Sequence, residues 1–369
     1  MADGSSAWLS ESSDRFVFTR LETQAQIGNI PKYADMKIGR TFFAYGPKKY
    51  AAADVREVYR GRFAAEGELP YLVPEQETAR VVDCRSGDVF MTLDYTQDEN
   101  KPEVFIGEGV ALNALRLQNT RDLQQIKDSA GKLKGSAQQS KCPNCGGPVR
   151  WVTGVATHVV CEYCQSQIEF NEDQVRVVAT NDMRVAQDEA LTLKIGSKAR
   201  IMAVDWWVIG AMKQSEVRGD EASQMAFSYN MPKVLVPAGE PWFEYLLYSP
   251  KDGFLWLTEL AGGRWAIAKT LDMWPQLQQP LRPVDSNQRL VPELYDYGGQ
   301  VQYAAGAFYW QVGPKDTTYY VDFGREKQKL STALTREEQS WSAISEIPAQ
   351  AVAAWFKQAQ IVSKPMDVA

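Results

Sequence analysis

The sequence predicts an α+β protein that is predominantly antiparallel β, with aromatic-rich β structure and a small cysteine-rich module near its middle. Nine of the eleven tryptophans fall between residues 206 and 355, mostly in strand-like segments separated by turn residues. Four of the five cysteines form two close pairs between residues 142 and 164. The 369 residues are 44% hydrophobic, which suggests two or three compact domains and not a disordered chain.

The N-terminal third has a mixed pattern. We expect residues 1–20, which are polar and rich in serine, to form a flexible arm, and residues 21–117 to form a mixed β domain. Within it, residues 50–60 are compatible with a short helix, whereas residues 89–95 and 103–107 alternate or run apolar, as strands do. Residues 118–140 then indicate a helical and basic linker.

The cysteine pairs have the spacing C-x2-C-x15-C-x2-C, made by Cys142, Cys145, Cys161 and Cys164. This spacing is typical of a structural zinc site, because each C-x2-C turn aims two thiolates at one ion and two turns complete a tetrahedron. Four thiolates fill the coordination sphere, so the zinc is expected to be structural. Two disulfides are an alternative that a cytoplasmic location disfavours, and a redox pair is one that two pairs at ribbon spacing disfavour. We therefore predict a zinc ribbon over residues 141–172.

Two other candidate residues lie in or before this module. The only histidine, His158, stands three residues before Cys161 on an expected strand, and we interpret it as a surface residue or a residue behind the metal ligands. The expected strands of the ribbon cover residues 149–153 and 156–160, around a turn at Gly154. Cys84 is a lone thiol before a turn, and we expect it to be buried or half-buried and unreactive.

Residues 185–360 are expected to form an aromatic-rich antiparallel β domain that closes with a helix over residues 349–360. The clearest hairpin joins Tyr248 to Phe254 through Asp252-Gly253. The density of aromatic residues fits a packed β core, and it also fits a groove for a peptide, a sugar or a base. Met36-Lys-Ile-Gly and Leu193-Lys-Ile-Gly each precede a strand-rich stretch, a weak sign of internal duplication.

Composition removes several function classes. With one histidine, a three-histidine zinc hydrolase and an H-E-x-x-H metalloprotease are impossible. Glu244 and Glu259 interrupt apolar strands and are candidates for carboxylate chemistry, although the polar face of a strand explains them equally well. No apolar run approaches the roughly 18 residues of a membrane span, and the first residues lack the features of a secretory signal. We therefore expect a cytoplasmic protein.

The charge balance bears on nucleic-acid binding. Forty basic and 46 acidic residues give a net charge of −6, which argues against a broadly basic nucleic-acid binder. A local excess of basic residues nevertheless precedes and enters the cysteine module: Arg121, Lys127, Lys132, Lys134, Lys141 and Arg150. A solvated linker explains this stretch, and a ribbon that binds nucleic acid remains the alternative.

The order of motifs resembles that of bacterial proteins that carry domain of unknown function 4178, often preceded by a zinc ribbon. The resemblance covers about residues 141–346, and residues 94–117 share it less specifically. Its residues are Cys142-Pro-Asn-Cys-Gly, Cys161-Glu-Tyr-Cys, Val208-Ile-Gly, Trp242-Phe-Glu-Tyr-Leu-Leu-Tyr, Gly253-Phe-Leu-Trp-Leu, Gly306-Ala-Phe-Tyr-Trp-Gln-Val, Tyr320-Val-Asp-Phe, Leu330-Ser and Glu338-Gln-Ser-Trp-Ser.

The resemblance implies a setting and brings no catalytic residues. Such genes often lie beside those for phage-shock-protein-A-like membrane remodellers, flotillin-like proteins, small membrane proteins and spermidine-synthase-like enzymes. This implies an accessory role in a membrane-stress or envelope-maintenance system. Our leading hypothesis is a non-catalytic zinc-ribbon adaptor that docks on a phage-shock-protein-A-like or flotillin-like partner at the inner face of the membrane. The alternatives are nucleic-acid binding through the ribbon, or a carboxylate enzyme acting on a small molecule such as a polyamine.

Overall fold

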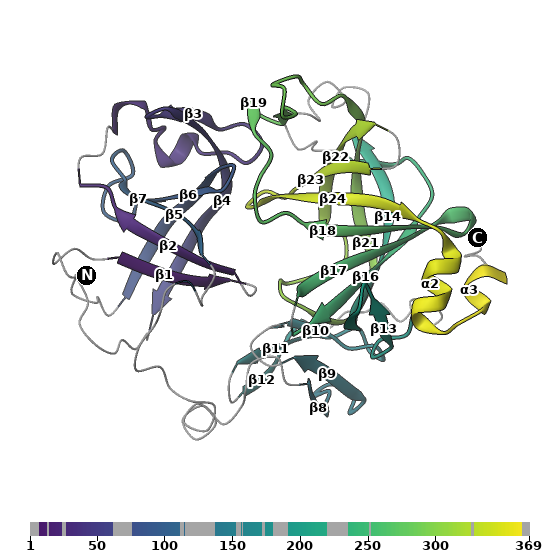
Figure 1. Ribbon diagram of the computed structural model, residues 1–369. Coiled ribbons are helices and arrows are strands. Elements are labelled where there is room, and N and C mark those ends of the chain that lie inside the picture. Colours follow the sequence, from purple (N-terminus) through teal and green to yellow (C-terminus); the bar gives the residue numbers. More distant parts are fainter. Residues whose placement is uncertain are drawn as a thin grey trace.

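A computed structural model gives the structure of the chain (Figure 1). It describes residues 7–12, 15–23, 27–61, 76–110, 114, 137–152, 156, 158–171, 174–179, 191–219, 235–250, 252–325 and 328–363. Strands dominate these ranges and pair antiparallel, which confirms the predominance of antiparallel β structure. The α-helices of the described ranges are the short α2 (Ala349–Phe356) and α3 (Gln360–Ser363), so the α+β label is weak.

The N-terminal part is one seven-stranded sheet with the order β1-β2-β7-β6-β5-β4-β3. Its strands are β1 (Ala7–Ser12), β2 (Arg15–Leu21), β3 (Phe42–Tyr45), β4 (Lys48–Gly61), β5 (Gln76–Ser86), β6 (Val89–Asp94) and β7 (Glu103–Val110). Two short 3₁₀ turns, η1 (Ile27–Asn29) and η2 (Tyr33–Asp35), connect β2 to β3. The core of this sheet includes Cys84, which is fully buried as expected.

Two segments of this region differ from the sequence predictions. Most of the segment expected to form a flexible arm supplies β1 and β2, and β2 pairs with β7. Residues 50–60, expected as a helix, lie in β4. Both faces of the first part of this strand are covered: Tyr50 and Ala52 pack in the core of the sheet, while Ala51 and Ala53 pack against the rest of the protein. Residues 56–59 of the strand are exposed. A strand buried on two faces shows a continuous apolar run, which periodicity does not separate from a helix.

The C-terminal part closes on itself as an eight-stranded antiparallel barrel, because β21 pairs with β22 on one edge and with β14 on the other. In order around the barrel, its strands are β14 (Val204–Gly219), β16 (Trp242–Ser249), β17 (Gly253–Leu260), β18 (Arg264–Thr270), β24 (Gln339–Ile347), β23 (Gln328–Leu334), β22 (Thr317–Arg325) and β21 (Glu293–Phe308). The β16–β17 hairpin through Gly253 confirms the predicted turn.

Shorter elements surround the barrel. They are β13 (Lys198–Ile201) and β15 (Leu235–Pro237), which pair with β14, together with β19 (Leu277–Gln279), β20 (Arg282–Pro283) and the 3₁₀ turn η6 (Ala261–Gly263).

Helix α2 ends at Lys357, which adopts a left-handed conformation, and α3 follows. Val352 and Phe356 of α2 are buried. Of the helices in the described ranges, none is long and apolar enough to cross a bilayer.

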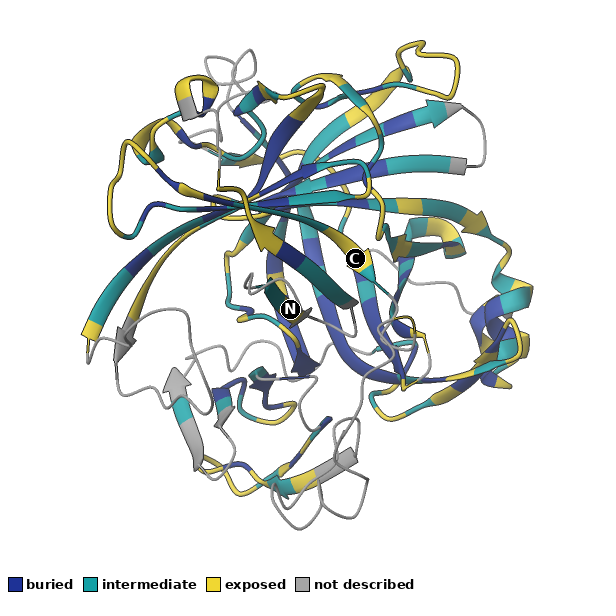
Figure 2. Ribbon diagram, turned by 60° about the vertical axis from the view of Figure 1, so that its left-hand side comes forward, coloured by how far each residue is buried: buried dark blue, intermediate teal, exposed yellow. Residues whose placement is uncertain are grey.

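The barrel carries its main apolar packing on the outside. Along β17, Leu255, Leu257 and Glu259 are buried, whereas Trp256 and Thr258 alternate with them and are only half-buried. The buried set faces outward and packs in one core with α2 and β13. The alternate set faces the lumen. Figure 2 shows this concentration of buried residues in the barrel strands. Because the packing is external, the lumen does not have to be filled by apolar side chains.

The N-terminal sheet docks on the β22–β24 side of the barrel. Ala51 and Ala53 of β4 share an apolar core with Trp341 of β24 and Phe323 of β22. The backbone joins the two parts as well, because Val55 N–H donates to the carbonyl of Glu337 at 2.8 Å. The two parts therefore form one continuous structure (Figure 1).

The two Lys-Ile-Gly segments occupy equivalent places in the two sheets. Gly39 and Gly196 both have a left-handed backbone, with φ of 72° and 87°, and each precedes a hairpin of a short strand and a long strand. The long strands β4 and β14 both carry an irregularity early in their pairing with the next strand. The series β3-β4-β5-β6-β7 thus has the same meander order as β13-β14-β16-β17-β18, which supports the suggested duplication.

Candidate metal centre and barrel cavity

The four cysteines of the C-x2-C pairs lie together in the turns of two hairpins. The first hairpin joins β8 (Ala137–Lys141) to β9 (Pro148–Val152), and the second joins β10 (His158–Val160) to β11 (Gln167–Asn171). Strand β12 (Gln174–Ala179) pairs with β11. The expected strands around Gly154 are both present, but each pairs across its own cysteine turn and not with the other. Gly154 itself lies outside the described residues.

The two cysteine turns have the same backbone geometry. Cys142 N–H donates to the carbonyl of Gly147 at 2.7 Å, and Gly146 N–H donates back to the carbonyl of Cys142 at 2.8 Å. In the second turn Cys161 N–H donates to Ser166 at 3.0 Å, and Gln165 N–H donates to Cys161 at 2.9 Å. Gly146 and Gln165 hold the same left-handed position, with φ of 76° and 58°.

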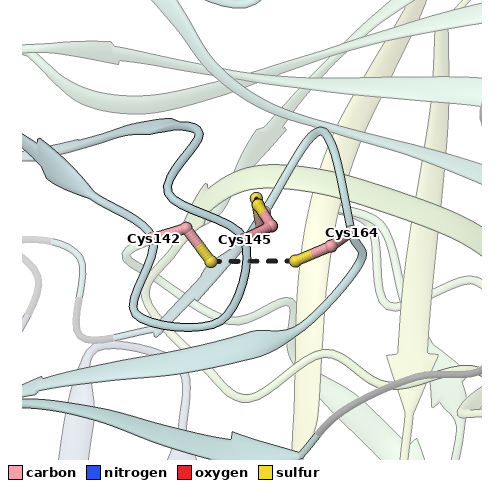
Figure 3. A group of neighbouring side chains, drawn as sticks. Cys142, Cys145 and Cys164 are labelled. Atoms are coloured by element: carbon pink, nitrogen blue, oxygen red, sulfur yellow. Dashed lines mark hydrogen bonds between the residues drawn. The ribbon is translucent and has the colours of Figure 1, made fainter.

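The sulfur atoms are spaced for a tetrahedral metal. The Cys142 and Cys164 Sγ atoms are 3.7 Å apart (Figure 3), and the Cys145 and Cys161 Sγ atoms are also 3.7 Å apart. All four lie within 4.8 Å of one another. A zinc ion with Zn–S bonds of about 2.3 Å places its ligands about 3.8 Å apart, whereas a disulfide requires about 2.05 Å. The donor set therefore fits a four-thiolate metal site.

Polar neighbours favour the thiolate at Cys164 in particular, whereas burial raises the pKa of Cys145 and Cys161. Gly147 N–H donates to Cys145 Sγ at 3.4 Å, and the Asn144 side-chain amide donates to Cys164 Sγ at 3.6 Å. Burial by itself raises the pKa of Cys164, but hydrogen bonds with Ser166 and neighbouring groups outweigh burial and lower it to about 6. Such second-layer contacts orient the ligands of a metal and favour their ionised form.

His158 does not join the cluster of sulfur atoms. It lies in β10, opposite Glu169 of β11 and Phe308 of β21, and is half-buried. Burial lowers the pKa of His158, and the nearby Glu169 carboxylate acts in the opposite direction. This position agrees with the prediction that His158 is not one of the metal ligands.

The cysteine cluster is joined to the barrel. Strand β10 extends the barrel sheet by pairing with the end of β21, with Val159 opposite Ala307. Cys142 and Cys161 are buried in the same apolar core as Phe308 and Leu246 of the barrel. Two of the four candidate ligands are therefore also core residues between the ribbon and the barrel.

The second candidate site is the lumen of the barrel, a cavity of about 560 Å³ to which all eight strands contribute. This volume lies within the usual range for small-molecule sites. Seven carboxylates and two basic residues line it: Glu216, Glu240, Glu244, Asp316, Asp322, Glu338, Glu346, Arg264 and Lys329. The lumen is therefore acidic.

Glu244 is a carboxylate of the lumen whose two oxygens both accept hydrogen bonds. Its Oε1 accepts a hydrogen bond from Trp242 Nε1 at 2.9 Å, and its Oε2 accepts one from the Gln214 side-chain amide at 2.8 Å. Burial raises the pKa of Glu244, and the two hydrogen bonds partly oppose that effect. The rings of Tyr297 and Tyr320 line the same region of the cavity.

Glu259, the other carboxylate singled out by sequence, lies on the outer face of the sheet. It is 1% exposed and accepts hydrogen bonds from Tyr245 at 2.9 Å and Thr192 at 2.8 Å.

The sequence pattern does not mark Gln214, Tyr297 or Tyr320 as site residues. Of the basic stretch 121–150, only Lys141 and Arg150 among its basic residues fall within the described part of the chain.

The comparisons with known proteins identify the barrel alone. Residues 194–347 match the model of the family described as Domain of unknown function (DUF4178). This range begins just before β13 and ends with β24, so it contains the barrel and leaves the cysteine cluster and the N-terminal sheet outside. No curated protein and no solved structure gives a significant match to the chain.

Proposed function

We propose that this protein is a non-catalytic adaptor in which four cysteines hold a structural zinc ion. The observation that supports this most strongly is the double role of Cys142 and Cys161, which offer sulfur ligands and also pack in the core shared with the barrel. Zinc with four thiolates has no open position for a water or a substrate. A metal held in this way fixes the ribbon to the barrel and stabilises their joint surface.

The arrangement of the carboxylates favours binding over catalysis. Glu244 faces the lumen and Glu259 faces the outer core, so the two cannot act as an acid–base pair across one substrate. Cys84 is fully buried, and burial raises the pKa of its thiol, as expected for a cysteine that only packs.

The partner that we propose is a phage-shock-protein-A-like or flotillin-like protein in a membrane-stress system. This part of the proposal comes from the family resemblance. The second cysteine turn supplies a candidate contact, because its Tyr163 side chain is 51% exposed. Partially exposed tyrosines are common anchors in protein interfaces, where the ring packs and the hydroxyl group remains hydrated.

The test combines metal analysis with affinity purification of the full-length protein from host membranes. We expect one zinc ion per chain and stoichiometric recovery of a membrane-remodelling protein. Tyr163→Ala should reduce that recovery, whereas Tyr59→Ala, which alters an exposed tyrosine of the N-terminal sheet, should not. Zinc without any specific partner would contradict the adaptor role, and absence of zinc would contradict the metal assignment.

A further inference from the structure

One carboxylate of the barrel lumen, Glu244, has no positively charged partner in the described ranges. Both oxygens of Glu244 accept hydrogen bonds, but the donors are the neutral indole of Trp242 and the neutral amide of Gln214. Within the described ranges, no ion pair involves Glu244. Ionising a buried carboxylate is costly unless a positive charge balances it.

The two basic residues that line the lumen do not pair with Glu244. Lys329 pairs with Glu346 at 3.4 Å, and Arg264 is exposed and donates from Nε to the Ala261 carbonyl at 3.4 Å. Arg218, which does not line the cavity, pairs with Glu216 at 3.2 Å. Asp322, a second carboxylate that lines the cavity, accepts a hydrogen bond from the neutral Ser331 hydroxyl at 2.6 Å. The interior therefore combines negative groups with neutral donors, which favours a cationic ligand over an anionic one.

Aromatic rings surround the same carboxylate. The rings of Trp242 and Tyr297 have centroids 5.8 Å apart in an edge-to-face arrangement, and the rings of Tyr297 and Tyr320 are stacked with centroids 5.1 Å apart. Tyr295 continues this series toward the end of the barrel, with its centroid 5.4 Å from that of Tyr297. The faces of electron-rich rings attract organic cations, most strongly where water is excluded.

The packing around Gln214 is tight on one side and leaves an acceptor unused. Gly299 lies so close that a Cβ atom there would be 2.2 Å from Gln214 Oε1 and 2.9 Å from the Trp242 ring. Gln214 Oε1 is buried and has no hydrogen-bond partner in the described structure. The close approach of Gly299 therefore fixes the Gln214 amide, whose Nε2 donates to Glu244.

We propose that the barrel lumen binds a small organic ammonium ion, with Glu244 as its counter-ion and Trp242, Tyr297 and Tyr320 as its aromatic wall. A primary ammonium group donates charge-assisted hydrogen bonds to the carboxylate, while its alkyl part packs on the rings. A hard metal cation is a poorer fit, because both Glu244 oxygens already accept hydrogen bonds and the wall offers rings in place of oxygen ligands.

The test compares three probes of similar size and different charge: n-butylammonium, 1-pentanol and pentanoate. Calorimetric titration of the full-length zinc-loaded protein at low ionic strength should give measurable affinity for n-butylammonium, at least about tenfold weaker binding of 1-pentanol, and no binding of pentanoate. Fluorescence of the lumen residues Trp242 and Trp256 provides an independent signal of binding. Equal affinity for the alcohol and the ammonium ion would overturn the proposal, as would tighter binding of Ca²⁺ at the same site.

Paired substitutions locate the ligand. Glu244→Gln keeps the size of the side chain and removes its charge, so it should weaken n-butylammonium binding about tenfold or more. Glu259→Gln alters a buried carboxylate on the outer face of the same sheet and should leave the affinity unchanged. Tyr320→Phe serves as a second lumen variant that retains the aromatic face and should bind nearly as well.

If Glu244→Gln does not fold, NMR spectra of the wild-type protein provide the test. A shift of the Trp242 indole N–H signal on titration with n-butylammonium supports the site, and an unchanged signal contradicts it.

Discussion

Glu244 and Glu259 lie on neighbouring antiparallel strands, one pairing position apart, and face opposite sides of the same sheet. Glu244 is opposite Thr258, and Glu259 is opposite Phe243. Glu244 faces the lumen with its hydrogen-bonding partners Trp242 and Gln214. Glu259 instead binds Tyr245 and Thr192 in the outer core and so links the segment before β13 to the barrel. Two similar interruptions of apolar strands therefore have different roles.

Glu259→Gln should stabilise the protein increasingly as the pH rises. Burial raises the pKa of Glu259 in the folded state, although hydrogen bonds from Thr192 and Tyr245 partly oppose it. The folded protein then binds this proton more tightly than the unfolded chain, whose glutamate pKa is about 4.3. Ionisation of Glu259 therefore lowers the free energy of unfolding of the wild-type protein. This loss is absent below the unfolded pKa and develops as the pH rises through the folded pKa.

Thermal unfolding of wild type and variant at pH 5 and pH 8 measures this effect. We expect the Tm of Glu259→Gln to exceed that of wild type by about 2–4 °C more at pH 8 than at pH 5, which corresponds to roughly 1 kcal/mol for a domain of this size. Glu240→Gln, at an exposed position, serves as the control. A variant less stable than wild type at pH 8 would mean that the charged carboxylate stabilises the outer core.

Removal of zinc should loosen the ribbon and the adjoining part of the barrel before it affects the N-terminal sheet. The cysteines share a core with Phe308 at the end of β21, whereas β4 to β6 form the separate core around Cys84. Because the binding energy of a structural zinc ion contributes to folding, chelation should lower the first Tm by about 10 °C or more.

Hydrogen exchange with and without chelator checks where the protein loosens. Protection should fall in β10, β11 and the end of β21 and persist in β5 and β6. Cys145→Ser should reproduce this pattern, whereas Cys84→Ala should retain a full complement of zinc. Uniform loss of protection across both sheets would show that the metal stabilises the whole chain and not one junction.

The sequence could predict the clustering of the four cysteines because they lie close along the chain and their spacing reflects local geometry. Cys142 and Cys145 are held by one turn, and the second turn repeats it. Closure of the barrel could not be predicted, because it depends on the pairing of β14 with β21, about 90 residues later. Met212, Gln214 and Glu216 alternate along β14 onto one face, but only closure of the barrel turns that face toward a lumen.

Gly146→Ala should weaken zinc binding without disturbing the packing of the ribbon. Gly146 has a φ of 76°, and a Cβ atom there would meet no other atom within 4 Å, so the effect isolates backbone strain. A left-handed residue other than glycine costs about 1 kcal/mol, which corresponds to roughly fivefold weaker binding. Competition with a colorimetric chelator measures the change. Gln165→Gly is the reciprocal variant in the second turn. It relieves the strain of a left-handed residue but removes a 3.2 Å hydrogen bond from the Gln165 side chain to the Cys161 carbonyl, so we expect zinc affinity to change little.

Gly299→Ala should abolish the binding of n-butylammonium while the barrel remains folded. The added methyl group would lie 2.2 Å from Gln214 Oε1 and 3.0 Å from the Tyr320 ring, so it displaces the side chains that position Glu244. Such overpacking typically destabilises by about 1–3 kcal/mol. Gly298→Ala is a matched control, because its methyl group would crowd Val217 at 2.8 Å and not the cluster around Glu244. Chemical denaturation should show a similar decrease in the free energy of unfolding for both variants, but only Gly299→Ala should fail to bind n-butylammonium. Equal loss of binding in both would indicate that general loosening of the barrel, and not the cluster around Glu244, controls the affinity.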